Sequence, residues 1–297
     1  MIRQLVLSLV LLCPARASLG QTADRQPSRE ATQTQLRPPG EGRLQILTSR
    51  GGMVGIGRIT EVRDGLVFFD QHPGGRAVFR VADIRRVEEV PASSVKDGEY
   101  WHPNPSGTRL FFAPTGRTLR RGEGYFSDTM LLLPSAAYGF TDRLSLAGGM
   151  SLVPGIGANQ LIYLIPRVAI ISKRNTSVAA GALLLTQASW WRDRDQGDVI
   201  GGWHAAATLG GPYRSVTAGV AVGLPNSRAA LMLGGEYRLT SRLMLVTENW
   251  LVGQSEPITS IGVRMLNEKV STTFGVYRVG AGGDSVAIPY LDFTIRR

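Results

Sequence analysis

The chain of 297 residues contains a single cysteine, Cys13, which lies inside a segment that we expect to be removed. Residues 1–17 start with a short basic stretch, continue through an apolar run over 5–12, and end on the small-x-small pattern of Ala15-Arg16-Ala17. This order is typical of a secretory signal peptide. A leucine precedes the cysteine, which does not fit a lipoprotein signal. The mature chain is therefore expected to have no disulfide, cysteine metal site or cysteine nucleophile.

The sequence also lacks a long hydrophobic run and a concentrated basic patch. The apolar run of the signal segment is much shorter than the ~20 residues that a membrane-spanning helix needs. The chain has 33 lysines and arginines against 23 aspartates and glutamates, a net charge of +10, but the excess is scattered along the sequence. Because no basic face forms, no nucleic-acid partner is expected.

Histidine is scarce, and the usual motifs for cofactors are missing. Of the three histidines, His72 and His102 precede prolines and have no partner at a metal-ligand spacing, so no metal site is predicted. The glycine-rich stretch from Gly51 to Gly57 neither opens a helix with G-x-G-x-x-G nor carries the lysine of a phosphate loop. We therefore expect turn glycines there and no cofactor.

Two kinds of segment follow the signal peptide. Residues 18–42 are rich in Gln, Thr, Arg and Pro, which predicts a disordered linker. Residues 43–90 alternate short apolar segments with turns at Arg63-Asp64-Gly65 and Pro73-Gly74-Gly75, which predicts about five short strands. In this layout the segment resembles the SH3-like and Sm-like small β modules. Residues 91–107, with Pro103 and Pro105, are expected to be a second linker.

From Thr108 onward the apolar segments become about 10 residues long, the length of a tilted strand that crosses a membrane. About twelve strands are predicted, at 108–113, 125–139, 143–153, 161–172, 176–187, 200–210, 215–224, 229–239, 243–252, 258–266, 270–279 and 286–295. Short polar connections alternate with longer ones, as in barrels that have short periplasmic turns and long outer loops. Residues 108–297 are therefore expected to form an antiparallel transmembrane β-barrel with both ends in the periplasm.

The alternation of side chains along these strands indicates which face is inside. In the strand 229–239, Leu231, Leu233 and Tyr237 share one face, whereas Glu236 and Arg238 share the other. An Arg or Lys that faces lipid at mid-depth costs ~2–4 kcal/mol, so the charged face is assigned to the lumen. The residues predicted to line the lumen are Arg167, His204, Glu236, Arg238, Glu248, Arg264 and Asp292.

Aromatic residues are expected to form two bands at opposite strand ends, as in the girdles of membrane barrels. Trp190, Trp191, Trp203 and Trp250 fall at the long-loop ends, and Tyr138, Phe140, Tyr213 and Tyr237 near the tight turns. On these features, 108–297 resembles the bacterial outer-membrane β-barrel proteins of porin-like type. One departure is the tail, since such barrels usually end in an aromatic residue and this chain ends in Arg296-Arg297.

The resemblance implies an outer-membrane location, contact with outer-membrane lipid, and a periplasmic position for the N-terminal module. Similar twelve-stranded phospholipases carry a His-x-Ser pair, but Ala205 and Ala206 follow His204 here, so no enzyme is expected. A narrow porin-like channel for small solutes is the first hypothesis. The alternative is a non-conducting barrel whose module binds a periplasmic protein or the cell wall, and a soluble secreted β-protein is the third.

Overall fold

The computed structural model describes residues 36–152, 160–188, 200–224, 228–253, 255–281 and 284–297. The chain divides into an N-terminal unit, Met1–Ser93, and a barrel unit, Ser94–Arg297. In the described ranges, no helix is both long and apolar enough to cross a bilayer. The predicted signal peptide and most of the first predicted linker lie outside the described residues.

The N-terminal unit is a five-stranded antiparallel sheet, as the sequence predicts. Its strands are β1 (Arg43–Ser49), β2 (Val54–Arg63), β3 (Leu66–Gln71), β4 (Arg76–Arg80) and β5 (Ile84–Pro91), with the 3-10 turns η1 (Val81–Asp83) and η2 (Ala92–Ser94) after β4 and β5. They lie in the order β4-β3-β2-β1-β5. Asp64 and Gly65 both have positive φ in the β2–β3 turn, the geometry that twisted two-residue hairpin turns require.

The core of this unit includes one residue that the sequence assigned to the linker. Leu47, Ile59, Val67 and Phe69 are buried together, and Leu36 packs with them. This isolated leucine lies in the polar stretch of the predicted linker 18–42 and is buried against the sheet. The ordered unit begins at least as early as Leu36.

The barrel unit contains two very short strands and twelve longer ones. The short pair is β6 (Val95–Lys96) and β7 (Glu99–Tyr100). The longer strands are β8 (Gly124–Thr129), β9 (Leu133–Gly139), β10 (Leu144–Met150), β11 (Gln160–Lys173), β12 (Thr176–Ala188), β13 (Ile200–Gly210), β14 (Arg214–Leu224), β15 (Ala229–Arg238), β16 (Leu243–Val252), β17 (Thr259–Leu266), β18 (Val270–Ala281) and β19 (Asp284–Arg296).

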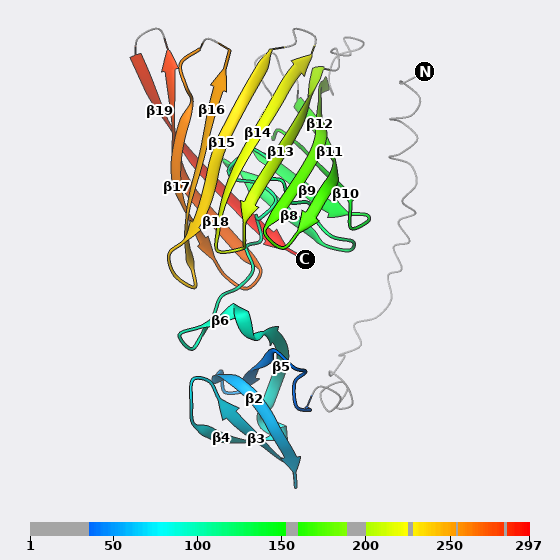
Figure 1. Cartoon of the computed structure of the whole chain (residues 1–297), viewed down its shortest axis with the longest axis vertical. Coiled ribbons are helices and arrows are strands. Elements are labelled where there is room, and N and C mark those ends of the chain that lie inside the picture. The colour runs from blue at the N-terminus through cyan, green and yellow to red at the C-terminus, as the bar shows by residue number, and fades with distance from the viewer. Residues whose placement is uncertain (1–35, 153–159, 189–199, 225–227, 254, 282–283) are drawn as a thin grey trace. The chain divides into compact units, whose positions relative to one another are not determined.

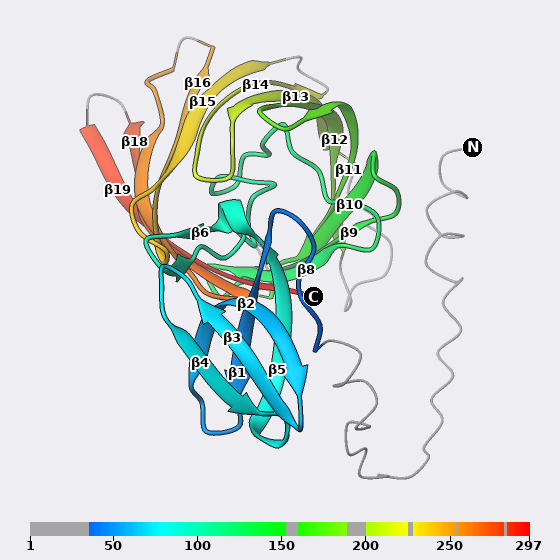
Figure 2. The ribbon, with the colours of Figure 1, turned by 60° about the horizontal axis from the view of Figure 1, so that its bottom comes forward.

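These twelve strands form a closed antiparallel barrel (Figures 1 and 2). Each pairs with its neighbour in sequence, and β19 closes the ring on β8. The predicted count is confirmed, but two of the predicted strands are wrong. Residues 108–113 are not a strand of the barrel, and 125–139 is a hairpin of two short strands, β8 and β9, rather than one long strand.

Connections alternate between the two ends of the barrel. The turn end carries 140–143, 174–175, 211–213, 239–242 and 267–269, together with the C-terminus. The loop end carries 130–132, 151–159, 189–199, 225–228, 253–258 and 282–283. In Figure 1 the loop end is at the top of the barrel, and the C-terminus is at the lower end of the barrel. The expected alternation is therefore present in part: 151–159, 189–199 and 253–258 are longer than any turn-end connection, whereas 130–132, 225–228 and 282–283 are as short.

Side chains alternate between an exposed apolar outer face and a buried inner face. Along β14 and β15, Val216, Leu231 and Leu233 are exposed, whereas Thr217 and Glu236 are buried. Residues that lie directly opposite each other on paired strands point to the same side of the sheet. The inward residues of one strand therefore identify the inward residues of the next strand. The barrel thus turns hydrocarbon side chains outward and polar side chains inward over its middle.

The expected aromatic bands are present in part. Tyr138, Phe140 and Tyr237 are exposed at the turn end, and Trp203 is exposed on the outer wall. Two assignments change: Tyr213 packs edge-on against Trp101, at 5.2 Å between ring centroids, and Trp250 points into the lumen. Trp190 and Trp191 lie outside the described residues. The band at the loop end therefore lacks the contribution expected from Trp250.

The β8–β9 turn holds two large residues in the left-handed region, Met130 with φ 60° and Leu131 with φ 59°. This conformation costs a residue with a side chain roughly 1–2 kcal/mol. Replacing the exposed Leu131 with glycine is expected to raise the free energy of unfolding by about 0.5–1 kcal/mol, after the larger unfolded-state entropy of glycine is counted. Urea denaturation in lipid vesicles measures the change.

The matched control is Ala137→Gly, in the interior of β9, where the backbone is extended. There the same kind of substitution is expected to lower stability by about 0.5–1 kcal/mol. Opposite signs for the two variants support strain in the turn, whereas a loss of stability in both would contradict it.

A candidate functional site in the barrel lumen

Residues 102–117, here called the internal segment, run inside the ring of strands (Figure 2). The centre of this segment is a narrow loop, closed by a 2.9 Å backbone hydrogen bond from Thr115 to Thr108, with Phe111 and Phe112 at its tip. The loop cannot pair with the wall as a strand would, so its backbone groups need other partners. Side chains on the inner face of the barrel supply them.

Glu248 of β16 holds the tip of the loop. Its Oε2 accepts three backbone N–H groups, from Phe111 at 2.9 Å, Phe112 at 3.0 Å and Ala113 at 2.8 Å. Its Oε1 accepts the Trp250 indole N–H at 2.8 Å and the Tyr277 hydroxyl at 2.9 Å. The carboxylate is fully buried, and these five bonds replace the water that it would otherwise bind.

Arg264 and Glu236 form the centre of the lumen. Arg264 Nη1 lies 2.6 Å from Glu236 Oε1, and both side chains are almost completely buried. Arg264 also donates to the Leu110 carbonyl. Glu236 binds two further side chains of the internal segment, Arg117 at 3.2 Å and Asn104 at 2.9 Å. Wall and segment thus share one network of charge-assisted hydrogen bonds.

A second ion pair anchors the loop to another strand of the wall. Arg109 Nη2 approaches both carboxylate oxygens of Asp292 in β19, at 2.7 and 2.9 Å. Arg167 of β11 donates instead to two carbonyls of the segment, those of Thr108 at 3.1 Å and of Thr115. Arg167 therefore holds both ends of the loop at one place on the wall, whereas Arg109 binds a different strand.

Near the turn end, the segment is fixed by contacts that leave no spare space. Arg238 of β15 donates to the His102 carbonyl, and Gly116 donates its N–H to Thr208 at 2.8 Å. A Cβ on Gly116 would stand 2.1 Å from the Ser177 carbonyl oxygen, so only glycine fits there. At Gly116 the backbone of the segment therefore lies directly against the wall.

Apolar packing reinforces these bonds. Leu110, Phe111 and Ala113 form one buried cluster with inward residues of the wall, which are Met232, Met244, Val246, Leu266, Tyr277 and Tyr290. The Phe111 ring lies 4.8 Å from that of Tyr290, nearly edge-on. The internal segment therefore provides a hydrophobic core for the middle of the barrel, which an empty lumen would lack.

His204 differs from the other predicted lumen residues. It lies on the inner face of β13, paired across to Gly181 and Ala221. Its Nε2 is buried and has no hydrogen-bond partner among the described residues. A Cβ on Gly181 would be 2.8 Å from the His204 ring, so the histidine fills the space of a missing side chain. No bond to the internal segment involves it in the described part of the chain.

The other six predicted lumen residues bond to the internal segment, directly or through its arginines: Arg167, Glu236, Arg238, Glu248, Arg264 and Asp292. The sequence reasoning missed Arg109 and Arg117, because it placed the first in a strand and the second in a loop. Pro114 and Gly116 lie between these two arginines and interrupt the alternation of apolar residues. They are the signals that could have identified an irregular segment.

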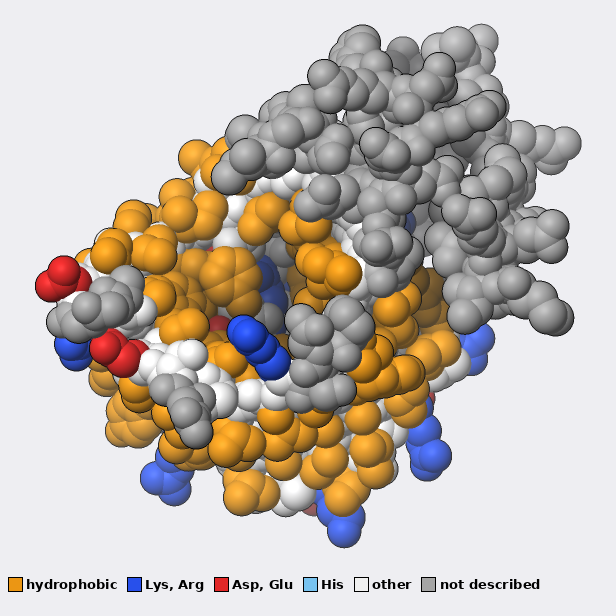
Figure 3. All heavy atoms as spheres, turned by 90° about the horizontal axis from the view of Figure 1, so that it is seen from above, with side chains coloured by type: hydrophobic (Ala, Val, Ile, Leu, Met, Phe, Trp, Pro, Cys, Tyr) orange, Lys and Arg blue, Asp and Glu red, His pale blue; other side chains and the backbone are white. Residues whose placement is uncertain are grey.

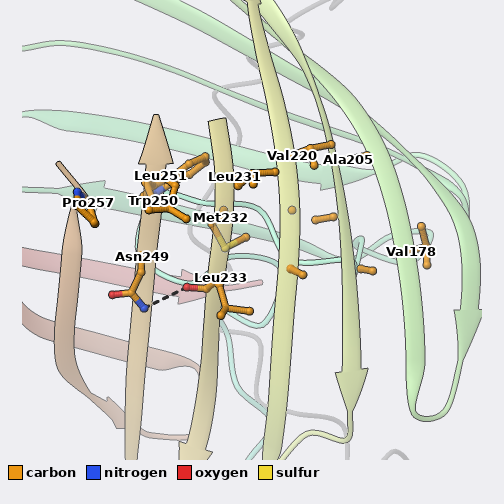
Figure 4. A pocket seen from close by; sticks show the side chains of 14 residues that line it. Val178, Ala205, Val220, Leu231, Met232, Leu233, Asn249, Trp250, Leu251 and Pro257 are labelled. Carbon is orange, nitrogen blue, oxygen red and sulfur yellow. Dashed lines mark hydrogen bonds between the residues drawn. The ribbon is translucent and has the colours of Figure 1, made fainter. Parts of the chain in front are cut away.

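A separate hollow of about 600 Å³ lies on the outer wall across β12 to β16 (Figure 4). Small residues such as Ala205 and Ala218 form its floor, and larger ones such as Val220, Leu231 and Leu251 border it. Because these side chains alternate with the inward ones, the hollow faces away from the lumen. Its lining is almost entirely apolar, so it offers no group for catalysis.

No group of three or more metal-ligating side chains occurs among the residues that the structure describes. In the lumen, the buried charged side chains of the wall thus form hydrogen bonds with the backbone of the internal segment and ion pairs with its arginines. The sequence matches no known protein family and no curated protein.

Proposed function

We propose that this chain is an outer-membrane β-barrel whose lumen is sealed by its own internal segment. The apolar outer face of the twelve-stranded barrel supports the membrane setting, because a spanning barrel must present hydrocarbon side chains to lipid. Unequal connections at the two ends support an orientation with the turn end in the periplasm. The N-terminal unit, which precedes the barrel in the chain, would then be periplasmic.

The network around Glu248 carries the proposal that the barrel is sealed. Lumen charges that line an aqueous pore are hydrated, whereas Glu248 accepts five protein donors and is fully buried. Arg264 and Glu236 likewise bond to each other and to the segment. These contacts favour the non-conducting barrel over the narrow porin-like channel. In this function the barrel anchors the N-terminal unit, which docks a periplasmic protein or the cell wall.

Electrophoresis and conductance together test the proposal. In an outer-membrane extract, the unboiled protein is expected to migrate faster than the boiled protein, because an intact barrel is more compact than the unfolded chain. Reconstituted in a planar bilayer, the unmodified protein is expected to give no stepwise current above that of the lipid alone.

Each alternative has its own result. A shifted band with reproducible current steps would show a porin-like channel and would contradict the seal. A protein that stays soluble and shows no shift would overturn the membrane barrel itself and leave the secreted β-protein. Deleting residues 43–90 is expected to abolish capture of a periplasmic partner without changing the band shift.

A further inference from the structure

The wall of the barrel is not equally tall all the way round. β19 pairs with β18 from Asp284 to Ile295, but it pairs with β8 only from Asp292 to Arg296. Residues 284–291 of β19 therefore have no partner strand on the β8 side among the described residues. This unpaired stretch is roughly 25 Å long at the rise of an extended strand. Among the residues that the structure describes, no strand fills the space between this stretch and the β8–β9 turn at 130–132, which is called here the notch.

The backbone along the notch is adapted to being unpaired. The last link across it is the hydrogen bond from Met130 N–H to the Leu291 carbonyl, at 2.7 Å. Two residues further along β19, on the same edge, is Pro289, which has no N–H to leave unsatisfied. The β8–β9 turn below carries Leu131 and Leu132, both exposed. The proline removes one unpaired donor from this edge, and the two leucines give the notch an apolar rim.

Inside the notch, the lumen beyond the internal segment is apolar. Phe112, which is 51% exposed, forms the floor; its ring lies tilted against Tyr277 and edge-on against Tyr290. From there to the loop end, strand register turns hydrophobic side chains inward. They include Leu185, Ile200, Val252, Val279, Val286 and Ile288. We call this space the upper chamber.

The exposure of these residues shows that the upper chamber is not filled by the described protein. Val286 and Ile288 point inward yet are 54% and 44% exposed. Figure 3, which looks into this end, shows a hollow with a largely hydrophobic wall, crossed by a Lys or Arg side chain. The polar side chains that the register turns toward this space include His204, near the floor, Tyr163, which lies opposite Leu185, and Asp284, at the rim.

We propose that the upper chamber binds a hydrocarbon chain of a membrane lipid, which enters sideways through the notch. This inference rests on the proposed membrane setting, since only then does the notch open onto acyl chains. A polar solute would find few partners on such a wall, and one that crossed the barrel would meet the sealed segment under Phe112. The headgroup stays at the membrane surface beside Asp284 and the loop end.

The test uses phosphatidylcholine vesicles that contain a small fraction of a phosphatidylcholine with a diazirine at the end of one acyl chain. The full-length protein is reconstituted, irradiated and digested, and labelled peptides are identified by mass spectrometry. Label is expected on Phe112 and Ile288, inside the chamber, as well as on outer-wall residues such as Leu231 and Leu233.

Two variants on the unpaired half of β19 sharpen the result. Ile288→Trp fills the chamber and is expected to lower labelling of Phe112 about tenfold, because it displaces contacts worth roughly two methylene groups. Ala287→Trp, the adjacent position, places the same indole on the outer face. This variant is expected to leave labelling of Phe112 unchanged. Ala287 and Ile288 are both exposed in the wild-type protein, so neither substitution disturbs a packed core.

The outcomes separate the inference from the proposed function. Labelled outer-wall residues with an unlabelled Phe112 would overturn the lipid-binding chamber and leave the membrane barrel intact. No label on either set would overturn both, because the protein would then not be inserted. Equal loss of Phe112 labelling in the two tryptophan variants would also count against the chamber, since the effect would not depend on the face.

Discussion

Replacing Glu248 with alanine is expected to release the internal segment and to produce current steps, which the unmodified barrel is expected not to give. The substitution removes the acceptor of five donors, three of them backbone N–H groups of the loop tip. Each buried donor left without a partner costs about 1–3 kcal/mol, so roughly 5 kcal/mol or more is lost while the loop stays in place. Expulsion of the loop relieves that cost by returning its backbone to water.

Current steps in a planar bilayer and the urea midpoint in vesicles measure the effect. Glu248→Gln is the informative companion, because its carbonyl oxygen can still accept the loop N–H groups through weaker, neutral hydrogen bonds. Its current and its loss of stability are expected to be intermediate. The control is Leu251→Ala on the outer face of the same strand, which should stay silent. If Glu248→Ala were as silent and as stable as that control, Glu248 would not hold the seal.

Replacing Arg264 with methionine is expected to cost about 3–5 kcal/mol of stability, the range for breaking a buried ion pair from one side. Methionine keeps most of the length of the side chain but leaves Glu236 with a buried negative charge and Leu110 with an unpaired carbonyl. Arg117 and Asn104 still bind Glu236, so the expected loss lies toward the lower end of that range.

A double-mutant cycle isolates the pair. Adding Glu236→Gln to Arg264→Met removes the stranded charge, so the double variant is expected to be more stable than the sum of the two single losses predicts. Exposed Arg242→Met at the turn end is the control and is expected to change stability by less than about 0.5 kcal/mol. Simple additivity of the two lumen substitutions would argue against a direct coupling of Arg264 and Glu236.

Much of the barrel could be predicted from the sequence, because strand length and alternation are local properties. Leu231 and Leu233 on one face and Glu236 and Arg238 on the other establish the inside of β15 without any knowledge of its neighbours. Alternation does not say what an inward charge meets, however. A glutamate that faces water and one that binds a loop backbone leave the same pattern in the sequence.

The internal segment was missed for the same reason. Residues 108–113 read as a short apolar strand because Leu110, Phe111 and Phe112 are hydrophobic, yet their partners are residues of the wall far along the chain. Glu248 binds N–H groups that precede it by 135–137 residues. The notch could not be predicted from the sequence of single strands either, because each strand there has an ordinary composition. Only the register of β19 on β8 shows it.

That register has a consequence for how the barrel assembles. The first and last strands meet over five residue pairs, and Arg296 bonds there to Glu123, just before β8 begins. If this seam formed first, Glu248 would face an open, hydrated lumen and the loop would have to enter a closed ring, so we expect the loop to be inside before the seam forms. Contacts so distant in sequence are slow to form, since a long chain must be ordered first. We therefore expect the β8–β19 pairing to form last in folding, after the strands have assembled around the loop.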